Sequence, residues 1–274
     1  YGITERSASY ERTGIGVLDQ FLGAEVHVEG EVVQIKQTGG PTVFNIRDET
    51  GTAPGTAFEE AGVRAHTNVD VGDYVHVLGE VESRNGNVQI EIDSIDVLDG
   101  TDAETVSDRL EAATVSAAEP ETISPLVEWP ALAQLFPELE TVASQLRRAV
   151  LESRPIRIRH HADGDGMCAA APVQLALERF VEATHEDTSA SRHLIKRLPS
   201  KAPFYEMEDA TRDLNYALGD RARHGQKLPL LLMLDNGSTE EDTPAYRTLD
   251  HYDIPIIVID HHHPDPEAVE PYVD

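Results

Sequence analysis

The stretch that most constrains the fold is residues 256–265, where the β-branched run Ile-Ile-Val-Ile leads directly into Asp260 and three histidines. An apolar run without polar alternation predicts a strand that is buried on both faces of a parallel sheet. Its metal-binding and proton-transferring groups would then stand at the carboxyl end of the strand, where open α/β sheets bind ligands. Because the histidines end a buried strand and not a flexible terminus, we interpret them as part of a functional site and not as a tag.

Two more apolar strand patterns end in acids or histidines. Residues 156–159 lead into His160, His161, Asp163 and Asp165, and residues 228–234 lead into Asp235. A further strand is expected in 192–198, with helices at 167–185, 206–223 and 239–251, and a helical pattern over 129–152 that Pro137 divides into two helices. This alternation predicts a doubly wound parallel α/β sheet, whose strand ends lie on one rim and bring the three clusters together.

So many carboxylates at one rim would repel one another unless cations neutralised them. Asp163 and Asp165 are two residues apart, so in an extended segment their side chains point the same way. Carboxylate and imidazole ligands without thiolate favour Mn²⁺ or Mg²⁺ over structural zinc. Two such ions can activate a water and stabilise the leaving oxygen of a phosphate ester, so we expect phosphoesterase chemistry here.

Residues 22–99 have a different pattern, with five short, turn-rich strands that predict a small all-β barrel. Asn85-Gly86 is a strong hairpin signal. The order of the segments 28–32, 44–51, 71–75 and 78–81 resembles an OB-fold domain. The resemblance implies binding of single-stranded nucleic acid through aromatic stacking and a basic groove, although OB-folds also bind oligosaccharides and proteins.

The candidate nucleic-acid-binding side chains are aromatic or basic. In the barrel they are Phe44, Arg47, Phe58 and Arg84, and between the first two acidic clusters they are Arg192, Lys196 and Arg197. Both phenylalanines have an alternative role as core residues. The cluster at 192–197 either grips a nucleic-acid backbone or is a solvated charge patch.

Length and composition set the domain plan. The 274 residues suffice for two domains. We expect a lead-in at 1–21, the barrel at 22–99, an acidic linker at 100–128, and the α/β domain at 129–274. The linker is predicted from its Thr, Ala, Glu and Asp content and its few large apolar residues.

The net charge of −28 comes from 50 acidic and 22 basic residues. Acids that are spread through folded segments, with little lysine, are typical of proteins from salt-loving organisms. In concentrated salt, counterion release contributes little, so stacking and hydrogen bonds must dominate nucleic-acid binding. Cys168 is the sole cysteine, and no membrane span or signal peptide is visible, so we expect a cytoplasmic protein without a membrane partner.

The motifs at 161–166, 234–238 and 259–262 together resemble the first three motifs of the DHH phosphoesterase superfamily, and the arrangement is similar to archaeal RecJ-like nucleases with an OB-fold domain. The resemblance implies a site with two Mn²⁺ ions, with Mg²⁺ as a substitute. It implies that the metal ligands are Asp163, Asp165, Asp235 and His261, and that His161, Asp260 and His262 complete the catalytic set. A fourth motif that the family has does not follow, so we expect a fragment of a longer enzyme.

The primary hypothesis is a RecJ-like exonuclease that hydrolyses single-stranded DNA or RNA, with replication or repair proteins as candidate partners. One alternative is a phosphodiesterase for short oligonucleotides or cyclic dinucleotides. The other is a non-catalytic scaffold of the replication machinery, which the intact acids and histidine of the motifs argue against.

Overall fold

The structure is a computed structural model that describes residues 12–273, so residues 1–11 of the expected lead-in and residue 274 lie outside the described residues. The chain divides into two compact units. The first comprises the chain up to residue 116, with 182–190 and 223–226. The second comprises 117–181, 191–222 and 227–274. Each unit is described by itself.

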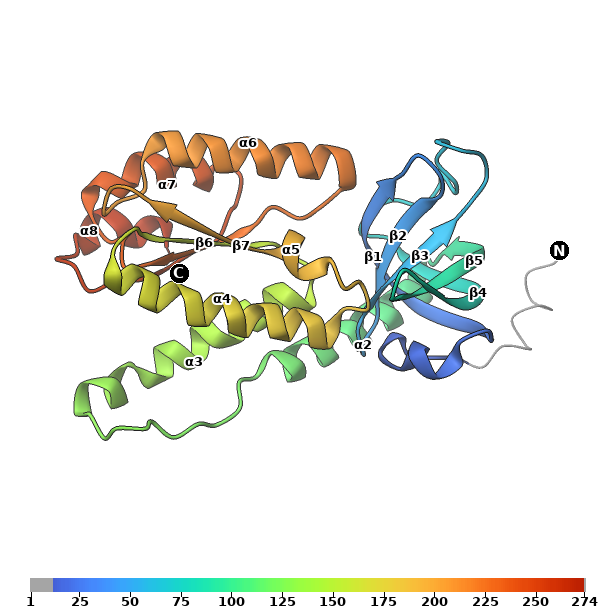
Figure 1. The fold of residues 1–274 in the computed structure, drawn as a ribbon, viewed down its shortest axis with the longest axis horizontal. Helices are drawn as coiled ribbons and strands as arrows, with labels where there is room; N and C mark the ends of the chain where they lie inside the picture. The colour runs from blue at the N-terminus through green and yellow to red at the C-terminus, as the bar shows by residue number, and fades with distance from the viewer. Residues whose placement is uncertain (1–11, 274) are drawn as a thin grey trace. The chain divides into compact units, whose positions relative to one another are not determined.

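The first unit is built around a closed five-stranded barrel (Figure 1). After the short helix η2 (Ile15–Phe21), its strands are β1 (Glu25–Gln37), β2 (Thr42–Arg47), β3 (Thr52–Ala57), β4 (Tyr74–Arg84) and β5 (Asn87–Val97). Their order is β1-β2-β3-β5-β4, and the parallel pairing of β3 with β5 closes an otherwise antiparallel barrel. At the β4–β5 hairpin, Asn85 and Gly86 have φ values of 53° and 83°, as a type I′ turn requires. The predicted all-β barrel is confirmed.

Residues 100–128 differ from the expected linker, because their first part is the helix α2 (Gly100–Ala118). Val106, Leu110 and Thr114 are buried at four-residue spacing, which forms one narrow buried stripe on an otherwise acidic helix. Arg109 adds ion pairs to Glu29 at 3.2 Å and to Glu49 at 3.1 Å. The composition of the segment did not predict this helix, because three residues at four-residue spacing are enough to bury one side of a helix.

The second unit is a three-layer α/β structure. Its elements are α3 (Pro130–Leu151), β6 (Ile156–His161), α4 (Gly164–Thr184), α5 (Ala190–Leu194), β7 (Ile195–Ser200), α6 (Met207–His224), β8 (Leu230–Leu234), η3 (Glu240–Asp242), α7 (Thr243–Asp250), β9 (Ile256–Ile259), α8 (Pro266–Val269) and η4 (Glu270–Tyr272). All strand pairings are parallel, in the order β7-β6-β8-β9. Figure 1 shows α3 and α4 on one face of the sheet and α6 and α7 on the other, which confirms the doubly wound arrangement.

The strand order creates a topological switch point between β6 and β8. From β6 the chain proceeds to β7 on one side, and from β8 it proceeds to β9 on the other. Doubly wound sheets bind ligands at the carboxyl edge beside such a point, where the loops after the two strands diverge.

Two details of the sequence prediction were wrong. Pro137 does not divide the helical segment, since α3 runs through it as one helix whose later part is anchored by the buried Leu146, Ala149 and Val150. The strand β9 is not buried on both faces along its length. It pairs with β8 on one side, and its last two residues, Val258 and Ile259, are half-buried.

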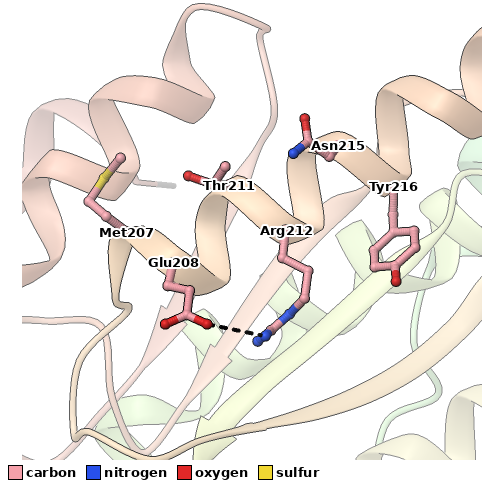
Figure 2. Close-up of a pocket in the computed structure, with 6 residues that line it drawn as sticks. All are labelled: Met207, Glu208, Thr211, Arg212, Asn215 and Tyr216. Atoms are coloured by element: carbon pink, nitrogen blue, oxygen red, sulfur yellow. Dashed lines mark ion pairs between the residues drawn. The ribbon is translucent and has the colours of Figure 1, made fainter.

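The outer face of α6 bears a shallow pocket lined by Met207, Glu208, Thr211, Arg212, Asn215 and Tyr216 (Figure 2). All six residues come from one helix, and Tyr216 is 67% exposed. The pocket lies apart from the acidic strand ends. Among residues 12–273, no helix is both long enough and apolar enough to cross a bilayer.

Candidate metal centre

The three predicted clusters do meet at the carboxyl edge of the sheet. His161 ends β6, Asp235 follows β8, and His261 and His262 follow β9. Two groups of side chains there each offer ligand atoms that lie within 4.8 Å of one another. One group is His161, Asp163 and Asp235, and the other is Asp235, His261 and His262. Asp235 belongs to both groups, which is the position expected of a carboxylate that bridges two cations.

The first turn of α4 presents the two acids of the first motif. The helix begins at Gly164, earlier than predicted, so Asp165 lies in its first turn and not in an extended segment. The Asp163 carboxylate accepts a hydrogen bond from the backbone N–H of Gly166 at 3.1 Å, as a helix-capping residue does. Desolvation raises the pKa of Asp163, but this hydrogen bond and the neighbouring His161 lower it more, so the net shift is downward.

Gly166 lets the helix start approach the strand ends closely. A Cβ at this position would lie 2.2 Å from the carbonyl oxygen of His161 and 2.9 Å from Oδ2 of Asp235. The first contact is impossible without moving the backbone. Glycine is therefore required where the turn after β6 packs against Asp235.

Asp235 combines a strained backbone with a buried carboxylate that lacks well-formed hydrogen bonds. It has a φ of 60° and is 6% exposed. Neither carboxylate oxygen accepts a hydrogen bond of good geometry within the described chain, although Nε2 of His261 stands 2.9 Å from Oδ1. Burial raises the pKa of Asp235, and the carboxylates of Asp165 and Asp163 raise it further. A buried carboxylate that accepts no well-formed hydrogen bond and lies among other acids is the arrangement that a cation relieves.

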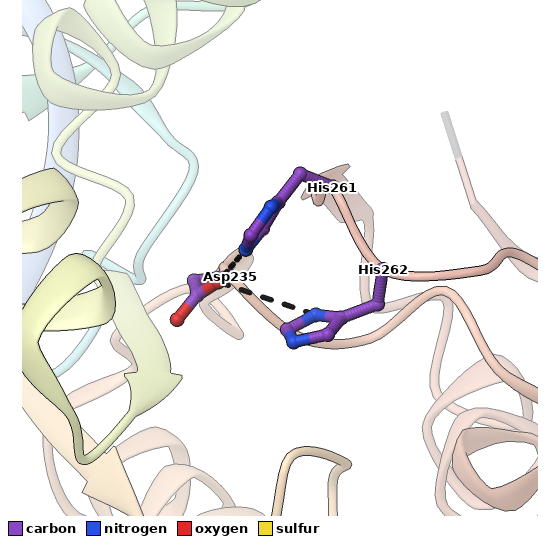
Figure 3. A group of neighbouring side chains, drawn as sticks. All are labelled: Asp235, His261 and His262. Carbon is purple, nitrogen blue, oxygen red and sulfur yellow. Dashed lines mark ion pairs between the residues drawn. The ribbon is translucent and has the colours of Figure 1, made fainter.

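His261 and His262 reach Asp235 from the loop after β9 (Figure 3). Nε2 of His261 also lies 3.3 Å from Oδ2 of Asp165, so His261 links the second and third clusters. Nδ1 of His262 lies 4.0 Å from Oδ1 of Asp235. His161 closes the other side, with its Nδ1 2.8 Å from Oδ2 of Asp163.

Asp260 orients this loop. Its carboxylate accepts hydrogen bonds from Ser238 Oγ at 2.6 Å, from the backbone N–H of His261 at 2.8 Å, and from Nδ1 of His262 at 2.6 Å. Burial raises the pKa of Asp260, but the hydrogen bonds from Ser238 and His262 outweigh it and leave a net lowering. The hydrogen bond to Asp260 raises the pKa of His262 and leaves its Nε2 as the atom that faces a ligand. Ser238 was missed by the sequence prediction, since its role depends on pairing across two loops.

These residues fit divalent cations. The donor set is carboxylate oxygen and imidazole nitrogen without thiolate, which suits Mn²⁺ or Mg²⁺. The unsatisfied oxygens of Asp235 supply the observation that such ions would explain. The bound ions would lower the pKa of a water and stabilise charge on a phosphoryl group.

Comparison with known proteins agrees with both halves of the fold. Residues 26–98 match a family described as an OB-fold nucleic acid binding domain, and residues 155–273 match the N-terminal domain of the DHH family. The chain thus carries an OB-fold domain followed by a DHH domain. Proteins of the DHH family are generally metal-dependent phosphoesterases.

Two relatives are much longer than this chain. An uncharacterised protein of Methanocaldococcus jannaschii, MJ1198, is 48% identical over 240 residues, which are 87% of this chain and 32% of that protein. The solved DHH domain structure of PF0399, described as a member of a family of ribosomal proteins, aligns with a TM-score of 0.62 and 40% identity. That alignment covers 64% of this chain and 42% of the solved chain. The chain thus spans about a third of the curated relative it matches.

Two of the predicted nucleic-acid contacts in the OB-fold domain are wrong. Phe44 is fully buried in the barrel core and cannot stack on a base. Arg47 is 8% exposed, and its Nε donates to Glu31 at 2.8 Å while its Nη1 donates to Thr114 at 3.2 Å. The alternation of β2 points both side chains inward or under α2, where no strand of nucleic acid can reach them.

The other two residues of the OB-fold domain are accessible but far apart. Phe58 is 68% exposed just after β3, and Arg84 is exposed at the end of β4. Since Gly55 pairs with Ile90, Phe58 lies level with Asp93, whereas Arg84 pairs with Asn87 at the other end of β5. Six residues of strand separate them by about 20 Å. They stay predicted contacts, but not members of one small patch.

The residues of the basic cluster in the DHH domain differ in their exposure to solvent. Arg192 on α5 and Lys196 on β7 are exposed. Arg197 is half-buried, and its Nη1 donates a hydrogen bond of 3.0 Å to Nε2 of His160. His160 is fully buried at the end of β6, and burial lowers its pKa, with the charge of Arg197 adding to the effect.

Proposed function

We propose that this protein is a metal-dependent phosphodiesterase that hydrolyses single-stranded nucleic acid, as a RecJ-like exonuclease with two Mn²⁺ ions. The observation that carries the proposal is Asp235, a buried carboxylate that accepts no hydrogen bond of good geometry and is surrounded by ligand atoms from the ends of the two neighbouring strands, β6 and β9. An OB-fold domain in the same chain supports a polymeric nucleic acid as the substrate.

In this proposal the side chains have distinct tasks. Asp163, Asp165, Asp235 and His261 hold the cations, with His161 beside them. Asp260 fixes the ring of His262, whose Nε2 then donates a hydrogen bond to a phosphoryl oxygen. Ser238 holds Asp260 in place. The protein thus contributes orientation and charge neutralisation around the scissile phosphate.

The geometry favours an enzyme over a scaffold. A scaffold has no need for a buried aspartate in the left-handed region of φ, which is a strained conformation that folds keep where function requires it. The same argument does not separate long from very short substrates. The presence of the OB-fold domain favours long strands, because a dinucleotide needs no second binding domain.

The test is to replace Asp235 by Asn in the full-length protein and to follow end-labelled single-stranded oligonucleotides in Mn²⁺. We expect cleavage and Mn²⁺ affinity, measured by calorimetry, each to fall by more than about 100-fold, because changes to residues that merely support metal ligands already cost about 10- to 100-fold. Chelation by EDTA should stop the wild-type enzyme, and added Mn²⁺ should restore it.

Glu267→Gln is the matched control, since Glu267 is an exposed acid on α8 in the same part of the chain. It should cleave as the wild type does. Cleavage that survives in the Asp235→Asn variant, or a wild-type protein that cleaves no strand with Mn²⁺ or Mg²⁺, would contradict the proposal. Single-nucleotide products from one end would identify an exonuclease.

A further inference from the structure

Arg197 on β7 is held in one orientation by three uncharged groups. Its Nε donates to Oε1 of Gln174 at 2.8 Å, and its Nη1 donates to Nε2 of His160 at 3.0 Å and contacts the sulfur of Met167 at 3.2 Å. Nδ1 of His160 lies 2.7 Å from the carbonyl oxygen of His161, so the ring donates there and accepts from Arg197. The guanidinium is therefore pre-oriented without being neutralised.

The rest of that guanidinium is free. Within residues 12–273, Nη2 of Arg197 has no hydrogen-bond partner, and Arg197 enters no ion pair. The buried Arg47 and Arg159, by contrast, pair with carboxylates. An oriented arginine with an open edge and no counter-ion is suited to bind an anion, above all a phosphate.

The position of Arg197 sets which phosphate it can reach. Met167, which it contacts, follows Gly166 in the first turn of α4, and that turn also carries Asp165. The strand β7 is separated from β8, and so from Asp235, by β6. Two inter-strand spacings put the two strands about 10 Å apart. A phosphate bound at the proposed metal ligands and a phosphate bound at Arg197 would therefore be two different phosphates of one strand.

We infer that Arg197 binds the phosphate next to the scissile one and thereby makes the enzyme prefer strands longer than a dinucleotide. This inference rests on the proposed function, because it needs a phosphodiester at the metal centre. His160 and Gln174 act as positioning residues that aim the guanidinium. A dinucleotide has one phosphodiester and leaves Arg197 without a ligand, whereas a longer strand fills both places.

The experiment compares Arg197→Gln with wild type on a dinucleotide and on a single-stranded pentanucleotide. We expect kcat/KM on the pentanucleotide to fall by about 10- to 100-fold, the range for a hydrogen bond to a charged group. The value on the dinucleotide should stay unchanged. Arg179→Gln removes an exposed arginine of α4 that has no role in the proposed site, and it should leave kcat/KM on both substrates unchanged.

A second measurement uses strands in which one phosphate is replaced by an uncharged methylphosphonate. In the wild type, replacement next to the scissile position should reproduce the loss, and in Arg197→Gln it should add nothing. The same comparison by binding anisotropy in Ca²⁺ needs no cleavage, so it tests Arg197 even if the protein proves not to be a nuclease. Failure of the proposed function and failure of this inference are thereby distinguished.

Equal losses on the dinucleotide and the pentanucleotide would overturn the inference, because they would mean that Arg197 acts on the metal centre or on the fold. A methylphosphonate effect that persists in Arg197→Gln would overturn it as well. Arg197→Lys keeps the charge and loses the planar fork, so it should show a smaller but substrate-specific loss. If Arg197→Gln fails to fold, the lysine variant decides the matter by the same criteria.

Discussion

At the residue scale, the candidate metal centre depends on two backbone positions as much as on its proposed ligands. Gly166 has no room for a Cβ, and Asp235 is held at a positive φ. Both allow the turn after β6 to pack against the end of β8, so that carboxylates from separate strands approach within ligand distance. Gly164, two residues away, has no atom within 4 Å of the place that a Cβ would occupy, and it carries no such constraint.

This contrast gives a matched pair of variants. Gly166→Ala should lower thermal stability and abolish Mn²⁺ binding, because its methyl group collides with the His161 carbonyl and with Asp235. Gly164→Ala should be neutral or stabilising by up to about 1 kcal/mol, since alanine is the better helix former. Circular dichroism melts and Mn²⁺ calorimetry would check both. Equal behaviour of the two variants would show that the close approach is unimportant.

At the element scale, β6 ties the sheet to α6 through a buried ionic network. Arg159 is 1% exposed and donates to both oxygens of Asp213, at 2.8 and 2.7 Å. Asp209 lies 3.2 Å from the same guanidinium, and the Tyr205 hydroxyl donates to Asp213 at 2.9 Å. The next residue on the strand is His160, so the network supports the strand that carries the first motif.

Removing one partner of this network should be costly. Asp213→Ala leaves the Arg159 guanidinium buried with an incomplete set of acceptors, which is expected to lower the free energy of unfolding of the second unit by about 3–5 kcal/mol. Glu208→Ala on the same helix removes a carboxylate that is 90% exposed and pairs with Arg212 at 4.0 Å, and should have almost no effect (Figure 2). Urea denaturation followed by circular dichroism would compare them. A loss below about 1 kcal/mol for Asp213→Ala would argue against the network.

At the scale of the whole molecule, the net charge of −28 is the dominant property. Like charges over the surface repel one another and oppose the folded state, and salt screens this repulsion. The same field repels the phosphates of a nucleic acid at low ionic strength. High salt should therefore assist both folding and substrate approach, in contrast with most nucleic-acid-binding proteins.

The melting temperature should accordingly rise as KCl is increased from about 0.1 M, where the Debye length is about 10 Å, to about 1 M, where it is about 3 Å. A melting series in KCl would measure this, with a series in an uncharged solute at matched osmolality as the control. A melting temperature that is constant or falls with KCl, or that rises equally with the uncharged solute, would show that charge repulsion does not limit stability.

Much of the fold was accessible from local patterns. The β-branched runs, the hairpin signal at Asn85-Gly86 and the strand–helix alternation predicted the barrel and the parallel sheet, and both are confirmed. These patterns are informative because side-chain period and turn chemistry act between residues that are near in sequence. The helix α2 and the uninterrupted α3 escaped prediction, since burial of a few spaced side chains overrode acidic composition and Pro137.

The sequence by itself determined which chemistry is present, because the acids and histidines stand where apolar strands end and the strand ends of a parallel sheet share one edge. Only the tertiary structure decided which of the candidate side chains are accessible to a ligand. It buried Phe44 and paired Arg47, since strand alternation and the packing of α2 depend on distant neighbours. It also brought Ser238 to Asp260 and His160 to Arg197. Those contacts join residues that are distant in sequence, and they depend on which strands are neighbours in the sheet.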